Sequence, residues 1–482
     1  MRRASAIAAN EIQRLVRSRV AFTGLLMVLL LTVAAAVASS AYYRDQGALR
    51  ERMEAQANAD FTQQPDRHPH RVVHFGHFAM RPPSGLAAMD PGVEPFTGVM
   101  VYLEGHRQNS ANFGDARQSS LLVRFGQLSP AFVLQAVAPL LLIFLGAGMV
   151  ARERERGTLR QMMLAGASGG DLMIGKMLAL GAAAAVMATP AVLLVGNLGL
   201  DGQVAAITGG MMLMGYGAYL VFWVVLTVLV SALTPGARPA LVLLTALWAL
   251  SVVVAPRVAA EAGAGLTQLA TRLENDVAIQ RDLRDMGDSH DPDDPYFDAF
   301  KRATLKQYGV ARVEDLPVNY RGLLGIEGER MTASLFNRYA AQNFAAMADQ
   351  SRTMDLVAAI SPTVALRRLS MTTAGTDLAT YRRFIDEAER YRYELVQRLN
   401  RMQAESVTFK DDAAKSNDAA AEARSRLSAD NWRATPAFRF PQEPAAETAA
   451  RATPSFVVIL VWLALAAGFA SLAASRLQRS AR

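Results

Sequence analysis

The sequence contains no cysteine, and only 19% of its 482 residues carry a charge. Without cysteine the protein has no disulfide bonds, no thiol nucleophile and no thiolate metal ligand. The charged fraction is low, and the apolar fraction of 51% is high, for a soluble protein. Ionisable side chains are nearly missing from the long apolar runs, which argues against a carrier that is coupled to protons or other ions.

The apolar residues are gathered in six runs, each close to the roughly 20 residues that a helix needs to cross a bilayer. The first run is too long for the apolar core of a cleavable signal peptide, which has roughly 7–15 residues. The predicted fold class is therefore mainly α, a helical membrane protein with six spans. The predicted spans are residues 20–41, 131–151, 176–196, 205–233, 238–256 and 454–475.

Basic residues near the ends of the spans predict the orientation, because cytoplasmic loops are enriched in Lys and Arg. They gather in residues 1–19, in the loop 152–175, in the turn around Arg238 and in the tail 476–482. With six spans these four segments lie on one side, so we expect both termini to be cytoplasmic in a bacterial inner membrane. The net charge of +7 is then a signature of topology and does not predict nucleic-acid binding.

The segments outside the spans differ in their patterns. Residues 1–19 have the spacing of an amphipathic helix on the cytoplasmic membrane surface, with a simple extension of the first span as the alternative. Residues 42–130 predict an irregular α+β external (periplasmic) domain, which opens with a helical extension over 43–59 and has a strand at Val99–Leu103. Residues 257–453 show helical patterns with mixed charges, and predict a large helical external domain between spans five and six.

Five of the six histidines fall in the first external segment, where His74 and His77 are candidate metal ligands three residues apart. The alternative is that this pair packs or hydrogen-bonds within the domain, because a His-x-x-His motif without a supporting acidic ligand is a weak signal. Further potential ligands are His68, His70, His106 and, for copper(I), Met80, Met89 and Met100.

The loop of residues 152–175, between spans two and three, is dense in charge and in helix-forming residues. Glu153–Leu164 predicts a short amphipathic helix parallel to the membrane, and the glycines that follow predict its end. Asp171 is the predicted N-cap of the third span. A helix that offers methionines and paired charges suits a groove on a soluble partner, and a solvated connector is the alternative from composition alone.

The same loop contains an apparent phosphate-binding motif. Gly170–Lys176 matches the G-x4-G-K part of a phosphate-binding loop, but Met177 stands where a magnesium-binding Ser or Thr is needed. No predicted strand precedes the motif, and a membrane span follows it. We therefore expect the chain to bind no nucleotide, and the sequence has no catalytic constellation that would make it an enzyme.

The run Glu153-Arg-Glu-Arg-Gly-Thr-Leu159, the helix that follows and Gly175-Lys176 at the entrance of a span resemble the coupling loop of ABC-2 type transporter permeases. These permeases are the membrane subunits of type V ABC exporters, and the surface helix and six spans of this chain resemble their layout too. The chain departs from the family pattern at Ala165-Gly-Ala-Ser168, where many relatives have a proline. Stretches that further resemble permeases with the domain of unknown function DUF3526 are His74–Phe78 with Pro82, Ile360–Ser370 and Ala374–Leu378.

The resemblance implies a permease subunit that binds no cofactor itself, while ATP and Mg are held by a separate cytoplasmic ABC ATPase. A second permease, identical or related, would pair with it in the lipid bilayer. A complex that transports nothing, and instead transmits mechanical work to a periplasmic partner or assembles it, is the alternative, and a membrane-anchored metal-handling protein is a third possibility. The coupling residues implied by the resemblance are Glu153, Arg154, Glu155, Gly157, Thr158, Leu159, Met162, Met163, Asp171 and Lys176.

Overall fold

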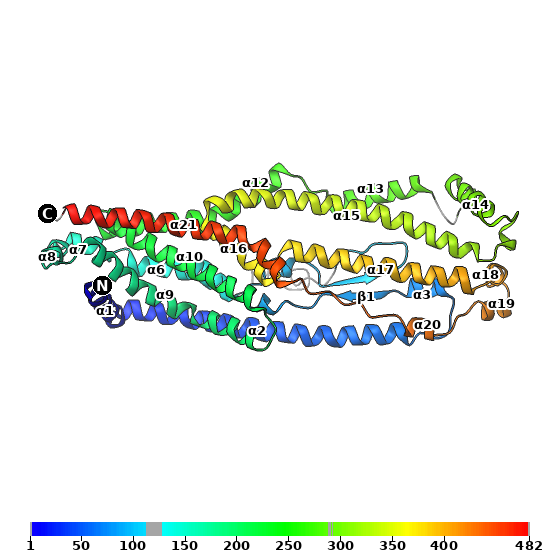
Figure 1. Cartoon of the computed structure of the whole chain (residues 1–482), viewed down its shortest axis with the longest axis horizontal. Coiled ribbons are helices and arrows are strands. Elements are labelled where there is room, and N and C mark those ends of the chain that lie inside the picture. Colours follow the sequence, from blue (N-terminus) through cyan, green and yellow to red (C-terminus); the bar gives the residue numbers. More distant parts are fainter. Residues whose placement is uncertain (1, 112–127, 288–290, 292, 481–482) are drawn as a thin grey trace.

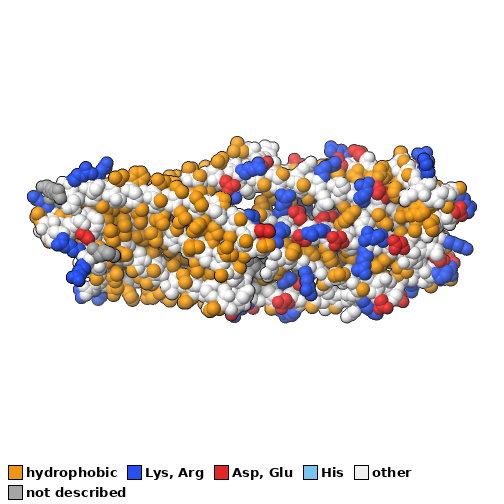
Figure 2. Space-filling model, viewed as in Figure 1, with side chains coloured by type: hydrophobic (Ala, Val, Ile, Leu, Met, Phe, Trp, Pro, Cys, Tyr) orange, Lys and Arg blue, Asp and Glu red, His pale blue; other side chains and the backbone are white. Residues whose placement is uncertain are grey.

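The computed structural model describes residues 2–111, 128–287, 291 and 293–480. The fold is mainly helical and elongated, with both termini at one end (Figure 1). Apolar side chains cover the half that carries the termini, and charged side chains of both signs gather on the other half (Figure 2). We call the half built from α1 and the apolar parts of the six long helices the span region. The other half is the distal region, which consists of a first distal segment, residues 42–111, and a second distal segment, the described residues of 267–444.

Six helices among the described residues are long and apolar enough to cross a membrane, so the chain is a membrane protein. Each predicted run lies within one of them, the fourth to within one residue. Two of the six contain π-helical turns, which are η4 (Val133–Val137) and η5 (Ala249–Val254). In chain order the six consist of α2 (Arg19–Thr62), α5 (Pro130–Phe132) with η4, α6 (Ala138–Gly146) and α7 (Ala151–Glu155), α9 (Gly169–Leu200), α10 (Ala206–Leu233), α11 (Ala237–Trp248) with η5 and α12 (Ala255–Leu266), and α21 (Ala445–Ser480).

The first span is preceded by a separate helix, α1 (Arg2–Arg17), and is not simply extended by it. Ser18 has extended backbone between the two helices, and its side chain accepts the amide N–H of Ala21 as the cap of α2. At 1.5 Å per residue, the 44 residues of α2 reach about 66 Å, roughly twice the hydrocarbon thickness of a bilayer. The polar second half of α2 therefore continues into the distal region, as the predicted helical extension over 43–59 requires.

The distal region is dominated by two long helices that run in opposite directions, α15 (Tyr320–Ile360) toward the spans and α17 (Leu378–Ser406) away from them (Figure 1). Between them α16 (Pro362–Ala374) enters the span region and packs against α10, α21 and η4. Most of its residues are buried. The shorter helices are α13 (Arg272–Met286), α14 (Pro295–Tyr308), α18 (Phe409–Ala414), α19 (Ala419–Arg424) and α20 (Asp430–Arg433), with the single-turn helices η1 (Gly85–Ala88), η2 (Glu94–Phe96) and η6 (Val313–Asp315).

The predicted strand at Val99–Leu103 corresponds to β2 (Met100–Leu103), which pairs in antiparallel register with β1 (His77–Met80), so that His77 lies opposite Leu103. The hairpin and the preceding helix α3 (Pro69–Phe75) pack on the second inserted segment. One buried cluster joins Phe61, Val72 and Val73 to Leu395, Leu399 and Trp432, and a second joins Ala79 and Val101 to Phe384 and Phe438. The two segments outside the spans therefore share their cores and form one packed unit.

Candidate functional site

Where the sequence predicted one helix over Glu153–Leu164, the structure has two, α7 at the end of the second long apolar helix and α8 (Thr158–Leu164) in the loop that follows. Gly157 with φ +73° separates them and Gly166 with φ +90° follows α8, a left-handed backbone that favours glycine. The N-cap of α9 is Ser168, so the prediction that Asp171 is the N-cap was wrong by three residues. Asp171 completes a capping box, because its carboxylate accepts the Ser168 N–H at 3.1 Å and its own N–H donates to Ser168 Oγ at 3.0 Å.

Glu153 and Lys176 face α1. The carboxylate of Glu153 accepts a hydrogen bond from the Thr158 hydroxyl and lies 3.5 Å from Nη1 of Arg14. Lys176 is fully buried, and its Nζ donates to Glu11 Oε1 at 2.6 Å while lying 4.0 Å from Glu153 Oε1. This group of charges fastens the loop and the start of the third span to the amino-terminal helix.

Arg154 and Glu155 bind the turn between the fourth and fifth spans. The Arg154 guanidinium donates to the carbonyls of Ala232 and Thr234 at the end of α10. The Glu155 carboxylate accepts the N–H of Ala237 at 2.9 Å, at the start of α11. Both groups satisfy polar backbone atoms that a helix end leaves unpaired. The two neighbouring charges therefore hold one helix by its carboxyl end and the next by its amino end.

The apolar predicted residues Leu159, Met162 and Met163 are half-buried and pack against the core of the span region. Each of them also keeps part of its surface exposed, so their predicted contact with a partner stays a prediction. Leu164, which the sequence analysis did not select, is an apolar residue at the surface of this loop with 73% of its side chain exposed. The exposed side chains of residues 152–175 are Arg152, Glu155, Arg156, Arg160, Gln161, Leu164, Ala165 and Ile174.

The far end of the loop is attached to the last span. The N–H of Gly169 donates to Gln478 Oε1 at 2.8 Å, and a side chain at position 169 would meet the Ala474 carbonyl oxygen at 2.2 Å. The Arg3 guanidinium also donates to the Gly166 carbonyl. The segment from α7 to the start of α9 is thus joined to α1, to the turn between α10 and α11, and to α21.

A second buried group of polar residues joins α16 to the spans. The hydroxyl of Tyr216 accepts from Gln135 Nε2 at 2.8 Å and lies 2.8 Å from Ser370 Oγ. Tyr219 donates to the Gln135 carbonyl at 2.8 Å, and its hydroxyl lies 3.0 Å from Thr363 Oγ1. Gln135 belongs to the π-helical turn η4, Tyr216 and Tyr219 to α10, and Ser370 and Thr363 to α16. This network ties the distal region to the second and fourth spans.

The fifth span enters the same network through its own π-helical turn. Ser251 Oγ lies 2.9 Å from Thr363 Oγ1, and the Ser251 carbonyl accepts from Ser361 Oγ at 3.2 Å. Trp248 Nε1 donates to the Ala136 carbonyl of η4 at 3.0 Å. Wide π-helical turns free carbonyls for such side-chain bonds. Both π-turns therefore lie where α16 meets the spans.

Asp90 lies at the edge of this network and is almost fully buried. Its carboxylate accepts the N–H of Gly92 at 3.0 Å, and its carbonyl accepts from the Thr376 hydroxyl at 3.0 Å. Burial raises the pKa of Asp90, although hydrogen bonds from Ser370, Gly92 and Gln135 oppose the shift. A carboxyl group whose ionisation is disfavoured by burial thus stands between the first distal segment, α16 and η4.

The histidines are arranged differently from the predicted pair. His77 is on β1, is buried and stacks on Phe61 with ring centroids 4.7 Å apart. His74 is exposed on α3, with its Nε2 3.1 Å from Nε2 of His70, and His106 lies close to both. His74 and His77 therefore do not share a site, and the packing role considered for them applies to His77.

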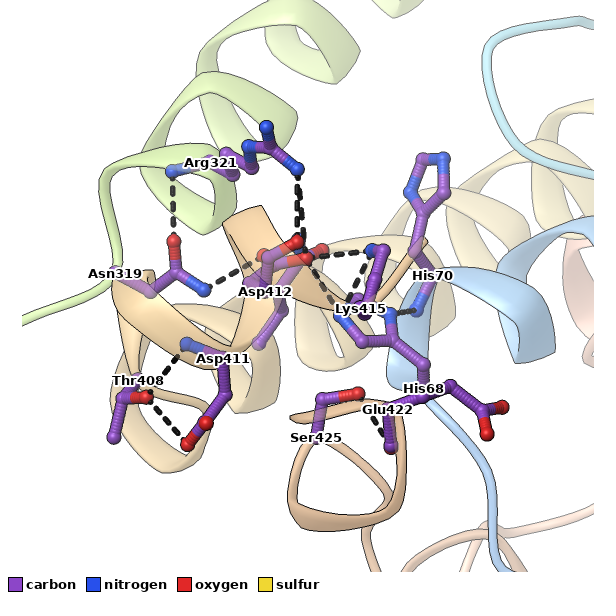
Figure 3. Close-up of polar contacts among 11 residues, drawn as sticks. His68, His70, Asn319, Arg321, Thr408, Asp411, Asp412, Lys415, Glu422 and Ser425 are labelled. Atoms are coloured by element: carbon purple, nitrogen blue, oxygen red, sulfur yellow. Dashed lines mark hydrogen bonds and ion pairs between the residues drawn. The ribbon is translucent and has the colours of Figure 1, made fainter. Parts of the chain in front are cut away.

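His68 is buried beside Asp412, in a group that joins the two distal segments (Figure 3). Its Nδ1 accepts the N–H of His70, so Nε2 carries the proton and donates to Asp412 Oδ1 at 3.1 Å. Asn319 and Gln403 donate to Asp412 Oδ2 at 2.7 and 2.8 Å. Burial alone would raise the pKa of Asp412, but the hydrogen bonds from His68, Lys415, Gln403 and Asn319 hold it far below its usual value.

Part of the second distal segment is similar to a known protein family. No curated protein matches the chain in sequence. Residues 272–441 match a protein family described as Domain of unknown function (DUF3526). The matched stretch runs from the start of α13 past α20 and includes α15, α16 and α17. The helix that enters the span region and the two long helices beside it therefore lie within the stretch that is similar to DUF3526.

Proposed function

We propose that this chain is the membrane-spanning subunit of an ATP-driven ABC transporter of the ABC-2 type, an exporter in the bacterial inner membrane. A separate cytoplasmic ATPase would hold ATP and Mg, and a second permease, identical or related, would pair with this chain around the transport path. The end that carries α7, α8 and both termini would be cytoplasmic, in agreement with the basic residues gathered there. The distal region would then be periplasmic.

The attachment of the loop between the second and third spans carries this proposal. Its charged residues Glu153, Arg154 and Glu155 bind inward to α1 and to the turn between α10 and α11. Its exposed face offers Arg156 and Arg160 beside the apolar Leu164. A partner that docks on this face can move α7 together with α1 and the turn between α10 and α11, because the contacts of α7 with them are charged hydrogen bonds. The motion of an ATPase would in this way reach several spans at once.

Docking is tested by co-expression and co-purification of the chain with candidate ABC ATPase subunits from the same organism. Arg156→Glu with Arg160→Glu reverses two exposed charges that make no inward contact, and should abolish co-purification and any increase in ATPase rate. The matched control is Arg302→Glu with Arg352→Glu, on exposed side chains of α14 and α15 in the distal region. The proposal fails if the unmodified chain binds no ATPase, or if the loop variant binds and stimulates it as well as the control.

A second candidate function, transmission of mechanical work to a periplasmic partner without transport, is supported by the network at α16. Hydrogen bonds link α16 to the second, fourth and fifth spans, and α15 and α17 continue from it through the distal region. Because the chain has no cysteine, single cysteines can be introduced on a natural background. Mechanical transmission predicts that ATP moves labels on α14 relative to α10, while cysteines at the interface between the spans of two paired permeases stay inaccessible to thiol reagents. Transport predicts that cysteines at this interface become accessible.

A further inference from the structure

The helix α3 carries two histidines on one face and is held in place by its opposite face. His70 and His74 are four residues apart, one turn along a helix, and thus project from the same side. Val72 and Val73 are buried on the other side, in the cluster shared with α17 and α20. The cap at His68 fixes where the helix begins, because its Nδ1 accepts the His70 N–H at 3.1 Å. The histidine face therefore has a defined position, and the His70 ring points away from the buried group around Asp412 (Figure 3).

His106 is brought to the same place by the turn after β2. Gly105 makes this approach possible, because a side chain there would meet Val73 Cγ1 at 2.2 Å, and its N–H donates to the Val73 carbonyl at 3.3 Å. His106 has φ +61° and is the non-glycine residue with left-handed backbone in the described part of the chain. For histidine this conformation costs energy, so the surrounding structure must hold it there.

Glu329 of α15 provides that hold. One carboxylate oxygen of Glu329 accepts the His106 backbone N–H at 2.9 Å and lies 3.5 Å from Nδ1 of the ring. Glu329 is itself fully buried and paired with Arg392 Nη2 at 2.6 Å. A carboxylate behind an imidazole is the usual partner of a metal-binding histidine, because it fixes the orientation of the ring and raises its basicity.

The ring nitrogens are spaced as metal ligands are. One nitrogen from each of His70, His74 and His106 lies within 4.8 Å of the others, and the two Nε2 atoms of His70 and His74 are 3.1 Å apart. Two ligands of a tetrahedral zinc ion are roughly 3.3 Å apart, because each Zn–N bond is about 2.0–2.1 Å.

We propose that His70, His74 and His106 form a binding site for a divalent transition-metal ion of the zinc class, with a fourth position open to solvent beside the exposed His74. Three imidazoles suit zinc and its neighbours better than Mg²⁺ or Ca²⁺, which prefer oxygen ligands. The methionines considered for copper(I) do not face solvent, since Met80, Met89 and Met100 are buried. The open position would accept water or a donor group of a periplasmic ligand.

The site also joins the two distal segments. Its ligands come from α3 and from the turn after β2, whereas the carboxylate behind His106 comes from α15 and the arginine that pairs with it from α17. A bound ion would therefore tighten the packing of the first distal segment on the second. This inference concerns the distal region and does not depend on the proposed ATPase partner.

The test uses the full chain, purified in detergent, stripped with a chelator and titrated with ZnCl₂ by calorimetry and elemental analysis. We expect about one zinc ion per chain, a higher Tm with zinc and no comparable effect of MgCl₂. His74→Gln should weaken zinc binding by more than the roughly 10–100-fold that is typical for loss of an outer-shell partner, and should remove the Tm increase. Because His74 is exposed, this variant should keep the Tm of the stripped unmodified chain.

The matched control is His77→Gln, which removes a histidine three residues away that faces Phe61 instead of the cluster. Its zinc affinity should stay within a few-fold of the unmodified chain, even if its Tm falls. With Co²⁺ in place of zinc, the visible absorption of a tetrahedral site should appear in the unmodified chain and in His77→Gln, and vanish in His74→Gln. The proposal is overturned if the unmodified chain retains no zinc, or if His77→Gln and His74→Gln lose it equally.

Discussion

Lys176 and Glu11 form a buried ion pair in which Nζ lies 2.6 Å from Oε1, between the third span and the amino-terminal helix. Lys176 is the lysine of the apparent phosphate-binding motif in the sequence. A lysine that binds phosphate must be able to reach a ligand, and this side chain is 1% exposed and already engaged. The pair therefore gives a structural reason for the lysine that is unrelated to nucleotides.

Replacement of Lys176 by methionine should destabilise the packing of α1 on α9. Removal of one partner leaves the buried Glu11 carboxylate without its main counter-charge, which costs about 3–5 kcal/mol in comparable cases. We expect about 3 kcal/mol, at the low end of that range, because Nη1 of Arg14 still lies 3.6 Å from Glu11 Oε1. Thermal unfolding in detergent measures the loss.

The control for this prediction is the double variant Glu11→Gln with Lys176→Met, which removes both charges and should recover part of the lost stability. Arg14→Gln changes a partly exposed neighbour and should cost about 1 kcal/mol or less. If the double variant were less stable than Lys176→Met alone, the pair would not be the source of the effect.

Gly175, the neighbour of Lys176, lets α1 approach α9. A side chain at this position would place Cβ 2.7 Å from Ile7 Cβ and 2.8 Å from the Ala4 carbonyl oxygen. Gly175→Val should therefore push α1 away, lower the Tm and make residues 1–18 sensitive to protease. Gly181→Ala, two turns along the same helix, meets nothing within 4 Å and should be neutral or stabilising by up to about 1 kcal/mol. Equal Tm values for the two variants would contradict the close approach.

The inward-facing charges of the loop should be needed for coupling to the ATPase but not for docking of the ATPase. Glu153→Ala removes the contacts with Thr158 and Arg14 but leaves the exposed face with Arg160 intact. We expect the variant to co-purify with the ATPase while the rise in ATPase rate caused by the complex is reduced. If Glu153→Ala lost the ATPase as completely as the charge reversals at the exposed arginines, Glu153 would belong to the docking surface.

The parts of the fold that follow from local patterns could be predicted from the sequence. The six apolar runs correspond to the six long apolar helices, and the run of β-branched, aromatic and other apolar residues at Val99–Leu103 corresponds to β2. The path of α16 could not be predicted, because its thirteen residues are too short for a span and carry Arg367 and Arg368 among apolar and hydroxyl residues. Only the tertiary fold shows that Thr363 and Ser370 bond to tyrosines more than 140 positions earlier.

The candidate sites were partly predictable for the same reason. The loop was found from its composition, but which residues face inward depends on α1 and on the turn between α10 and α11. The histidine segment was found as well, yet the three-residue spacing of His74 and His77 crosses from α3 to β1, past Gly76. The helical four-residue spacing of His70 and His74 was the better signal.

Asp412 should make the stability of the distal region fall at low pH. Its pKa is lower in the folded than in the unfolded chain, so its contribution is complete above the unfolded value of about 3.9 and is lost as the pH falls below it. Asp412→Asn should flatten the acid side of the Tm-against-pH curve and lower the Tm near pH 7. Asp430→Asn, at an exposed side chain of α20, should leave that curve unchanged. If the Tm of Asp412→Asn fell with decreasing pH as steeply as that of the unmodified chain, Asp412 would not be the cause of the loss of stability in acid.

Asp90 should have the opposite effect and make the stability of the chain fall as the pH rises. Its pKa is raised by burial, so the folded state is penalised once the carboxyl must ionise, and its contribution is lost as the pH rises from the unfolded value of about 3.9 through the folded one. Asp90→Asn keeps the shape of the neutral carboxyl group and cannot ionise. Between pH 5 and pH 8 the Tm of the unmodified chain should therefore fall relative to that of Asp90→Asn, whereas Asp298→Asn, at a partly exposed side chain of α14, should follow the unmodified chain. Ser370 and Gln135 hydrogen-bond the Asp90 side chain from α16 and η4. A constant difference in Tm across this range would contradict the prediction, because it would mean that the folded-state carboxyl is already ionised at pH 5, as it is in the unfolded chain.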